Sequence, residues 1–412
     1  MKRVLIAMGF ALVSGNVLSQ ELPERLSLPA LLRLVAERSP RLAVERAGIE
    51  AAEADLVTAG AIPNPTVSIG RMRPNGGVPN TVVDASRQQQ AGVELPVLIA
   101  GQRGARVDAA EQGVLGARAR VVQAANEIAL RAAELFAGLQ AAQERAAVLA
   151  DAQGEYERAA ALVSGRQSSG MASRYDLARV EMEVAGIAVR LSDARADAAE
   201  KSAGIAALLG AAGWRPVAEG LLEPAGLKSD LPAWQALVAG NPQLLAARRE
   251  EDIARASVAR AERERWPVPV LSAGRTWTSD PFGAANYIGI ATEVPIFDTR
   301  RGQLEKAQAE LRAAERRRTA LETEIAVELR RLLAALELRR AALARFESKV
   351  DVRSPELRQM AEDAYRLGRG TLLELIDSAR TRVDARVTDI DLRALTVQQE
   401  LRILALTGGL SG

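Results

Sequence analysis

The chain has 412 residues, and its 54 basic residues nearly balance its 52 acidic residues. It contains no Cys and no His, which excludes disulfides, thiolate nucleophiles, His general bases and zinc sites built from imidazole or thiolate ligands. The near-neutral charge argues against a nucleic-acid-binding surface. Aromatic residues make up 3% of the chain, and a composition led by Ala, Leu, Arg and Glu is typical of long helices.

The N-terminus has the pattern of a secretory signal. Lys2 and Arg3 form a charged start, residues 4–13 form an apolar run, and small residues precede Gln20. An apolar run of this length is too short to cross a bilayer, which takes ~20 residues. We therefore expect residues 1–19 to be a signal peptide and the rest of the chain to leave the cytoplasm.

The remaining sequence repeats itself after about 200 residues, a period typical of internal duplication. The tripeptide Leu-Pro-Ala at 28–30 recurs at 231–233, Ser-Pro-Arg-Leu at 39–42 corresponds to Asn-Pro-Gln-Leu at 241–244, and the segment 93–97 corresponds to 292–296. We infer a first repeat at residues 20–212, a Pro- and Gly-rich linker at 213–230 and a second repeat at 231–412.

Each repeat is expected to contain a helix, a pair of strands and two long helices. In the first repeat we expect helices at 28–60, 104–162 and 173–209 and alternating strands at 66–70 and 90–95, joined by a loop at 73–80. A helix of about 60 residues would be ~90 Å long, which no compact core requires.

The second repeat gives a helix from 231 to 266, strands at 268–277 and 287–297 around a loop at 278–284, and helices at 301–350 and 355–406. Aromatic residues gather between 266 and 297, as they do at the headgroup level of outer-membrane strands. A hydrophobic cluster under a hairpin would explain the same gathering. Four strands cannot close a transmembrane barrel, so strands that cross the membrane require several chains to share one barrel.

The two-fold repeat, the four short strands and the Gly-x5-[Asp/Glu] turns resemble the TolC-like outer-membrane factors of tripartite efflux systems. Segments 62–65, 94–96 and 101–103 look most like the cobalt-zinc-cadmium efflux branch of that family. The resemblance implies a mainly α-helical homotrimer with a transmembrane β-barrel of twelve strands, four from each subunit, above a periplasmic helical tunnel. It further implies a periplasmic adaptor protein, an RND-type inner-membrane pump and outer-membrane lipid as partners. The chain has no Cys, so it lacks the lipid-bearing N-terminal Cys of many metal-efflux relatives.

The resemblance also places the periplasmic gate near Gly170 and Gly368, where the long helices of each repeat meet. Glu374 and Asp377 follow Gly368 and share one helix face, and Asp176 holds the place equivalent to Glu374 in the first repeat. Threefold symmetry would turn Glu374 and Asp377 into a carboxylate ring that attracts cations, with a solvated helix face as the alternative reading. The nearest candidates in sequence to hold such a tip shut are three arginines, Arg174, Arg179 and Arg380.

The function expected from these features is a passive exit duct for heavy-metal cations in the outer membrane, with no enzymatic activity, no cofactor and no dedicated metal site. No nucleophile–base pair is available without His and Cys. The sequence leaves two alternatives open: the same duct with a drug, a siderophore or a secreted protein as cargo, or a periplasmic coiled-coil scaffold or adaptor.

Overall fold

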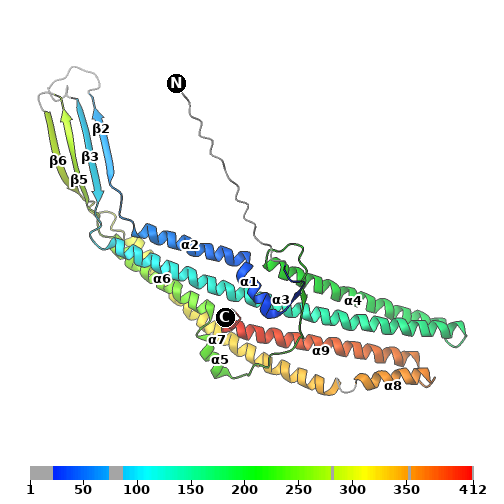
Figure 1. Cartoon of the computed structure of the whole chain (residues 1–412). Coiled ribbons are helices and arrows are strands. Elements are labelled where there is room, and N and C mark those ends of the chain that lie inside the picture. The colour runs from blue at the N-terminus through cyan, green and yellow to red at the C-terminus, as the bar shows by residue number, and fades with distance from the viewer. Residues whose placement is uncertain (1–21, 74–86, 280–282, 351–353, 411–412) are drawn as a thin grey trace, which may run out of the picture.

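The computed structural model of the chain describes residues 22–73, 87–279, 283–350 and 354–410. The expected signal peptide at 1–19 lies outside these residues, as do most of the loop at 73–80 and the centre of the loop at 278–284. The described chain is an elongated rod, with a β-sheet at one end and the turns of two helical hairpins at the other (Figure 1).

The first repeat and the linker contain four helices and four strands within the described residues. In chain order they are β1 (Arg25–Leu26), α1 (Leu28–Arg38), α2 (Pro40–Gly60), β2 (Thr66–Met72), β3 (Gln88–Pro96), α3 (Gln102–Ser168), α4 (Arg174–Leu208) and β4 (Val217–Ala218). The 67 residues of α3 correspond to ~100 Å of helix, so this single element runs nearly the whole length of the rod.

The second repeat follows the same order with one additional helix break. Its elements are α5 (Leu231–Val238), α6 (Pro242–Glu264), β5 (Val270–Thr278), β6 (Gly283–Ala291), α7 (Arg301–Val350), α8 (Ser354–Arg366) and α9 (Leu372–Leu406). The helix predicted at 301–350 matches the structure, and each of the two predicted strand pairs is present, as β2–β3 and β5–β6. No helix in the described part of the chain is both long enough and apolar enough to cross a bilayer.

Both helices predicted at the start of the repeats are broken, which corrects the expectation of single helices at 28–60 and 231–266. Ser39 and Asn241 are extended, with ψ of 122° and 126°, because each precedes a proline. Pro40 and Pro242 then take the first position of α2 and α6, where a missing N–H costs no helical hydrogen bond.

Further boundaries differ from the prediction, including the start of β6 at Gly283 rather than Tyr287. Strand β6 ends at Ala291 rather than Phe297, because its partner β5 begins at Val270, directly after Pro269. Pro295 cannot donate to a ladder, and the segment beyond bends through a hydrogen bond from Ile296 N to Val294 O at 2.9 Å. The helix expected at 355–406 is two helices, since α8 stops at Arg366 and α9 starts at Leu372 around Gly368.

The linker is held against the second repeat by one buried ion pair. Glu400 is 2% exposed, accepts backbone N–H groups of Ala225 at 2.5 Å and Gly226 at 3.1 Å, and is paired with Arg340. Because a buried charge is tolerated when it is paired and fully hydrogen-bonded, this pair fixes the linker halfway along the rod. The parallel β1–β4 pair adds the N-terminal segment to the same level.

The four-stranded sheet is antiparallel in the order β2-β3-β5-β6, so the two strand pairs join through β3 and β5. Alternation and register give it two faces of different chemistry. We call one the apolar face, which carries Val67, Ile69, Ala91, Val93, Leu95, Leu271, Ala273, Ile288 and Ile290. The other, the polar face, carries Thr66, Ser68, Gln88, Gln90, Glu94, Ser272, Thr276, Thr278 and Tyr287.

Candidate functional site at the hairpin tips

The turn between α3 and α4 lies at the end of the rod farthest from the sheet (Figure 1). Gly170 has a φ of 77°, a left-handed conformation that glycine adopts without a steric penalty. The N–H groups of Gly170 and Met171 donate to Gln167 O at 3.1 Å and Arg166 O at 2.8 Å, which satisfies the last carbonyls of α3. The chain therefore reverses at Gly170, as predicted.

The turn between α8 and α9 is built in the same way. Gly368 has a φ of 70°, and the N–H groups of Arg369 and Gly370 both donate to Ala364 O at 2.9 Å. Because α8 ends here with satisfied carbonyls, the second reversal falls at Gly368, and the two turns lie at the same end of the rod (Figure 1).

Three residues after each glycine, a hydroxyl residue caps the next helix. Ser173 Oγ accepts the N–H of Asp176 at 3.1 Å, and the carboxylate of Asp176 accepts the N–H of Ser173 at 3.0 Å. Thr371 and Glu374 form the same reciprocal pair, at 3.2 Å and 2.8 Å. Each pair is a capping box that satisfies two otherwise unpaired N–H groups at a helix start.

The capping boxes give two of the predicted gate carboxylates a structural role that the sequence analysis did not identify. Asp176 and Glu374 are the third residues of α4 and α9, and the shared pattern Gly-x-x-[Ser/Thr]-x-x-[Asp/Glu] encodes a helix end followed by a helix start. The hydrogen bonds from Ser173 lower the pKa of Asp176, so this carboxylate stays charged in the folded chain. Asp377, one turn further along α9, is exposed.

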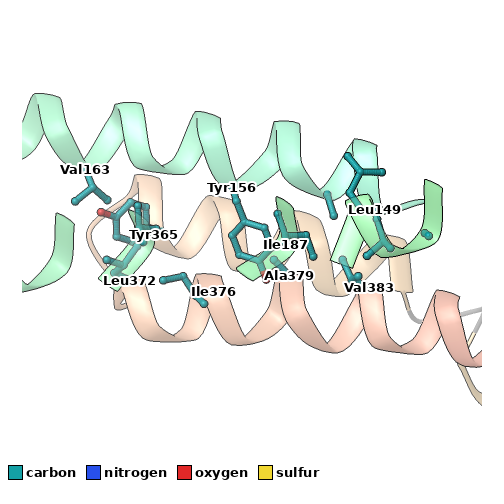
Figure 2. Close-up of a cluster of buried hydrophobic side chains, with 13 residues drawn as sticks. Leu149, Tyr156, Val163, Ile187, Tyr365, Leu372, Ile376, Ala379 and Val383 are labelled. Atoms are coloured by element: carbon teal, nitrogen blue, oxygen red, sulfur yellow. The ribbon is translucent and has the colours of Figure 1, made fainter. Parts of the chain in front are cut away.

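Behind the turns, a hydrophobic cluster joins the α3–α4 hairpin to the α8–α9 hairpin. Figure 2 shows Tyr156 and Tyr365 lying between the helices, with Leu372 and Ile376 of α9 beneath them. The guanidinium of Arg166 lies 4.7 Å from the centre of the Tyr365 ring, a cation–π distance. Burial first, and then the nearby Glu183, raise the pKa of Tyr156 to about 12, so its hydroxyl stays protonated.

Two ion pairs tie α9 to the first hairpin at this level. Arg382 contacts Glu155 of α3 at 2.9 Å, with the two side chains 15% and 20% exposed, and Arg190 of α4 contacts Asp384 at 3.0 Å. The Arg382–Glu155 pair is the more shielded from solvent, so it is expected to contribute more than an exposed pair, which is worth ~0–1 kcal/mol. Any movement of α9 away from α3 breaks it.

Two of the three predicted arginines, Arg179 and Arg380, contact residues of their own helices. Arg179 donates to the Tyr175 hydroxyl at 3.3 Å, and Arg380 lies 4.0 Å from Asp384. Sequence reasoning missed Arg382 and Arg190, because their partners lie 227 and 194 residues away along the chain. No local motif signals such a pair.

A groove of about 320 Å³ opens beside the Arg382–Glu155 pair, between α3 and the α8–α9 hairpin. Its walls combine apolar residues such as Leu162 and Leu375 with the charged residues Arg158, Glu362 and Asp363. The described residues contain no group of three or more carboxylates arranged to hold a metal ion. The groove therefore presents both apolar and charged groups to solvent.

The comparisons with known proteins give the chain its family. The family model described as outer membrane efflux protein matches residues 31–211 and 233–409. The chain belongs to the outer membrane efflux protein family. The two matches fall on the two halves of the chain, and the family consists of transport conduits in the outer membrane.

Curated relatives match most of the chain, and one of them matches nearly all of it. The cobalt-zinc-cadmium resistance protein CzcC of Cupriavidus metallidurans is 24% identical over 400 residues, covering 95% of this chain and 92% of CzcC. The nickel and cobalt resistance protein CnrC of the same species is 28% identical over 294 residues, covering 70% of this chain and 68% of CnrC.

Solved structures confirm the fold class. VceC of Vibrio cholerae has a TM-score of 0.75 at 19% identity, covering 93% of this chain and 96% of VceC. The CmeC outer-membrane channel of Campylobacter jejuni has a TM-score of 0.79 at 13% identity, covering 93% of this chain and 85% of CmeC. The chain of this efflux protein is therefore mainly helical, with strands of the barrel-forming kind, as the sequence predicted. Its family gives it the predicted outer-membrane location.

Proposed function

We propose that this efflux protein is the homotrimeric exit duct of a tripartite system that exports heavy-metal cations. In this assembly an RND-type pump in the inner membrane supplies the energy, and a periplasmic adaptor joins the pump to the hairpin tips. The match to CzcC along nearly the whole chain is the observation that supports heavy-metal cations as the cargo.

The edges of the sheet support the trimer. Within the described residues, β2 and β6 are paired on one side, which leaves a row of unsatisfied backbone groups on the other. Such edges cannot face lipid, but β2 of one copy can pair with β6 of the next, and three copies then close a barrel of twelve strands.

The charge on the polar face supports cation passage. Glu94 is the one charged residue on this face among the described strand residues, and its neighbours in the register are Thr66 and Ser272. With the apolar face toward lipid, the duct wall presents hydroxyl and amide groups plus one carboxylate per copy. A wall of this kind favours cations without holding them, as charged rings in channels do.

The tip residues support a gate. In a trimer the exposed Asp377 and the cap residue Glu374 of each copy lie close to the axis, and the repulsion between the six carboxylates favours an open tip. The Arg382–Glu155 and Arg190–Asp384 pairs and the Tyr156 cluster oppose this by holding α9 to its own chain. An adaptor that binds the groove beside Glu155 can exchange these contacts for its own, which shifts the population toward the open state.

Metal content of cells tests the cargo. The chain is expressed in a host that keeps a cobalt-zinc-cadmium pump and adaptor but lacks their outer-membrane component, and cellular Co, Zn and Cd are measured by mass spectrometry. We expect metal content to fall toward that of the intact host, and to stay high when the pump is also deleted. A chain that reaches the outer membrane as a trimer and leaves metal content at the empty-vector level contradicts the metal cargo. In that case a drug or siderophore remains as the second candidate.

A further inference from the structure

The apolar face of the sheet changes character toward the end that carries the strand-connecting loops. Near the helices it carries Leu95, Leu271 and Ile290, and toward the loops it carries Arg71, Arg275 and Trp277. Beyond the helix end of the strands, Trp266 is 58% exposed and Phe297 is 99% exposed, and Trp277 is 43% exposed near the loops. Exposed aromatic residues thus lie near both ends of the sheet, as they do at the two interfaces of a membrane.

The order of residues along this face puts the arginines at the outer boundary. A nine-residue strand such as β5, tilted by about 40°, rises ~23 Å across the membrane, close to the ~25 Å of a barrel's apolar band. Apolar residues occupy the rows of this face nearer the helices, and Arg71, Arg275 and Trp277 occupy the rows nearest the loops. Arg71, Arg275 and Trp277 therefore lie at the level of the outer headgroups, where a charge on the lipid side is tolerated.

Three arginines come together there on adjacent strands. Arg71 lies in the same row as Gln89 and Trp277, and Arg275 lies one row nearer the helices on this face. Arg87 lies two residues from Gln89, on the side of the loops. Its carbonyl accepts the N–H of Ser279 at 3.0 Å, which continues the β3–β5 ladder. Strand spacing puts the chains of Arg71 and Arg275 ~10 Å apart sideways, within joint reach of one ligand.

These arginines have no acidic partner on their own face. All three are exposed, and no Asp or Glu occupies the apolar face among the described strand residues. Arg275 lies over the Trp277 ring at 5.7 Å, an arrangement that orients its guanidinium. In a closed barrel β2 meets β6 of the next copy, and the described residues of β6 on this face include no Asp or Glu.

We propose that Arg71, Arg87 and Arg275 bind the phosphate groups of an outer-leaflet lipid of the lipid A type. A guanidinium donates two parallel hydrogen bonds to a phosphate, and the acyl chains of the same lipid cover the exposed apolar residues nearer the helices. The proposal rests on the outer-membrane location of the family and is independent of the metal cargo and of the gate. The cargo passes the opposite, polar face.

Lipid binding by the purified full-length protein tests the site. Native mass spectrometry is used to titrate lipid A, lipid A from which both phosphates have been removed, and inorganic phosphate. We expect lipid A to bind at least 10-fold more tightly than the dephosphorylated lipid, and millimolar inorganic phosphate not to displace it. The combined variant R71Q, R87Q and R275Q should bind lipid A at least 10-fold more weakly than wild type, whereas the three corresponding Lys substitutions should stay within about 3-fold.

The matched control removes three exposed arginines of α7 with the combined variant R312Q, R316Q and R317Q, which changes the net charge equally and should leave lipid A binding unchanged. Equal binding of lipid A with and without phosphates overturns the proposal, and so does wild-type affinity in the Gln variant. Displacement by inorganic phosphate assigns the arginines to a soluble anion instead and also overturns it. Should the Gln variant fail to assemble, the comparison of the two lipids on wild-type protein still decides.

Discussion

The capping boxes predict how the tips respond to loss of a single hydroxyl. Thr371→Ala removes the oxygen that accepts the N–H of Glu374 at 3.2 Å, and Ser173→Ala removes the acceptor of the Asp176 N–H at 3.1 Å. Loss of an N-cap typically costs about 1 kcal/mol. Since 1.4 kcal/mol corresponds to a tenfold change in an equilibrium, the first turn of α9 or α4 should open about 5-fold more often.

Hydrogen–deuterium exchange of the tip peptides measures this opening directly. We expect faster exchange at the start of α9 in Thr371→Ala and at the start of α4 in Ser173→Ala, with each variant leaving the other tip unchanged. Thr388→Ala is the control, because Thr388 lies inside α9 and donates to the Asp384 carbonyl without capping a helix. Glu374→Gln should also stay close to wild type, since a Gln side chain can complete the box.

An unchanged exchange rate in both cap variants would refute the structural role of these residues. If Glu374→Gln alone accelerates exchange, the charge of the carboxylate rather than its hydrogen bond stabilises the turn. Either result would mean that Glu374 acts at the tip mainly through its charge and not through its capping hydrogen bond.

Three further predictions concern the sheet, the tip cluster and the gate. Gly274→Val should destabilise the assembled protein by ~1–3 kcal/mol in thermal unfolding, because a Cβ there would lie 2.5 Å from both the Ala91 carbonyl oxygen and the Tyr287 hydroxyl. Since the pKa of Tyr156 is raised to about 12, its stabilising contribution is complete below pH ~10 and is lost as the pH rises through 12. The unfolding temperature of wild type should therefore fall more steeply in this range than that of Tyr156→Phe, and an equal fall in the two proteins would contradict this. The combined variant E374Q and D377N should change single-channel conductance and cation preference, most strongly at low salt, and wild-type conductance would place these carboxylates away from the constriction.

The long elements of this fold were predictable because their signals are local and continuous. The stretch that became α3 contains no proline, and the four strands alternate between two kinds of residue along their length. Helix breaks at Pro40 and Pro242 were missed, since the apolar spacing continues across both prolines. Each proline in fact starts a new helix, a role that its position after Ser39 or Asn241 already indicated.

At the hairpin tips, the sequence predicted the positions of the turns but not the contacts of the residues that follow them. The sequence located both reversals through Gly170 and Gly368, and it identified the acidic residues that follow them. Their spacing from Ser173 and Thr371 carried the capping signal, but the carboxylates were read for their charge alone. The Arg382–Glu155 pair depends on how two hairpins pack, which neither hairpin's sequence specifies.

The faces of the sheet required the register as well as the alternation. Each strand alone shows two kinds of residue, but only the pairing aligns Glu94 with Ser272 on one face and brings Arg71 near Arg275 on the other. A one-residue slip would exchange the faces of a strand, so these groupings could not be assigned before the pairing was known.

Single-channel recording in planar bilayers tests the central claim, that this chain assembles into a duct through the outer membrane. Purified full-length protein is added to one side of the bilayer, and the current is recorded in KCl at several concentrations. The structure predicts discrete conductance steps with a preference for cations over anions that weakens as salt rises, because the polar face and the tips carry carboxylates. Protein that inserts as a trimer and yields no conductance steps even when the Arg382–Glu155 and Arg190–Asp384 pairs are removed, or yields steps that prefer anions, would contradict the account.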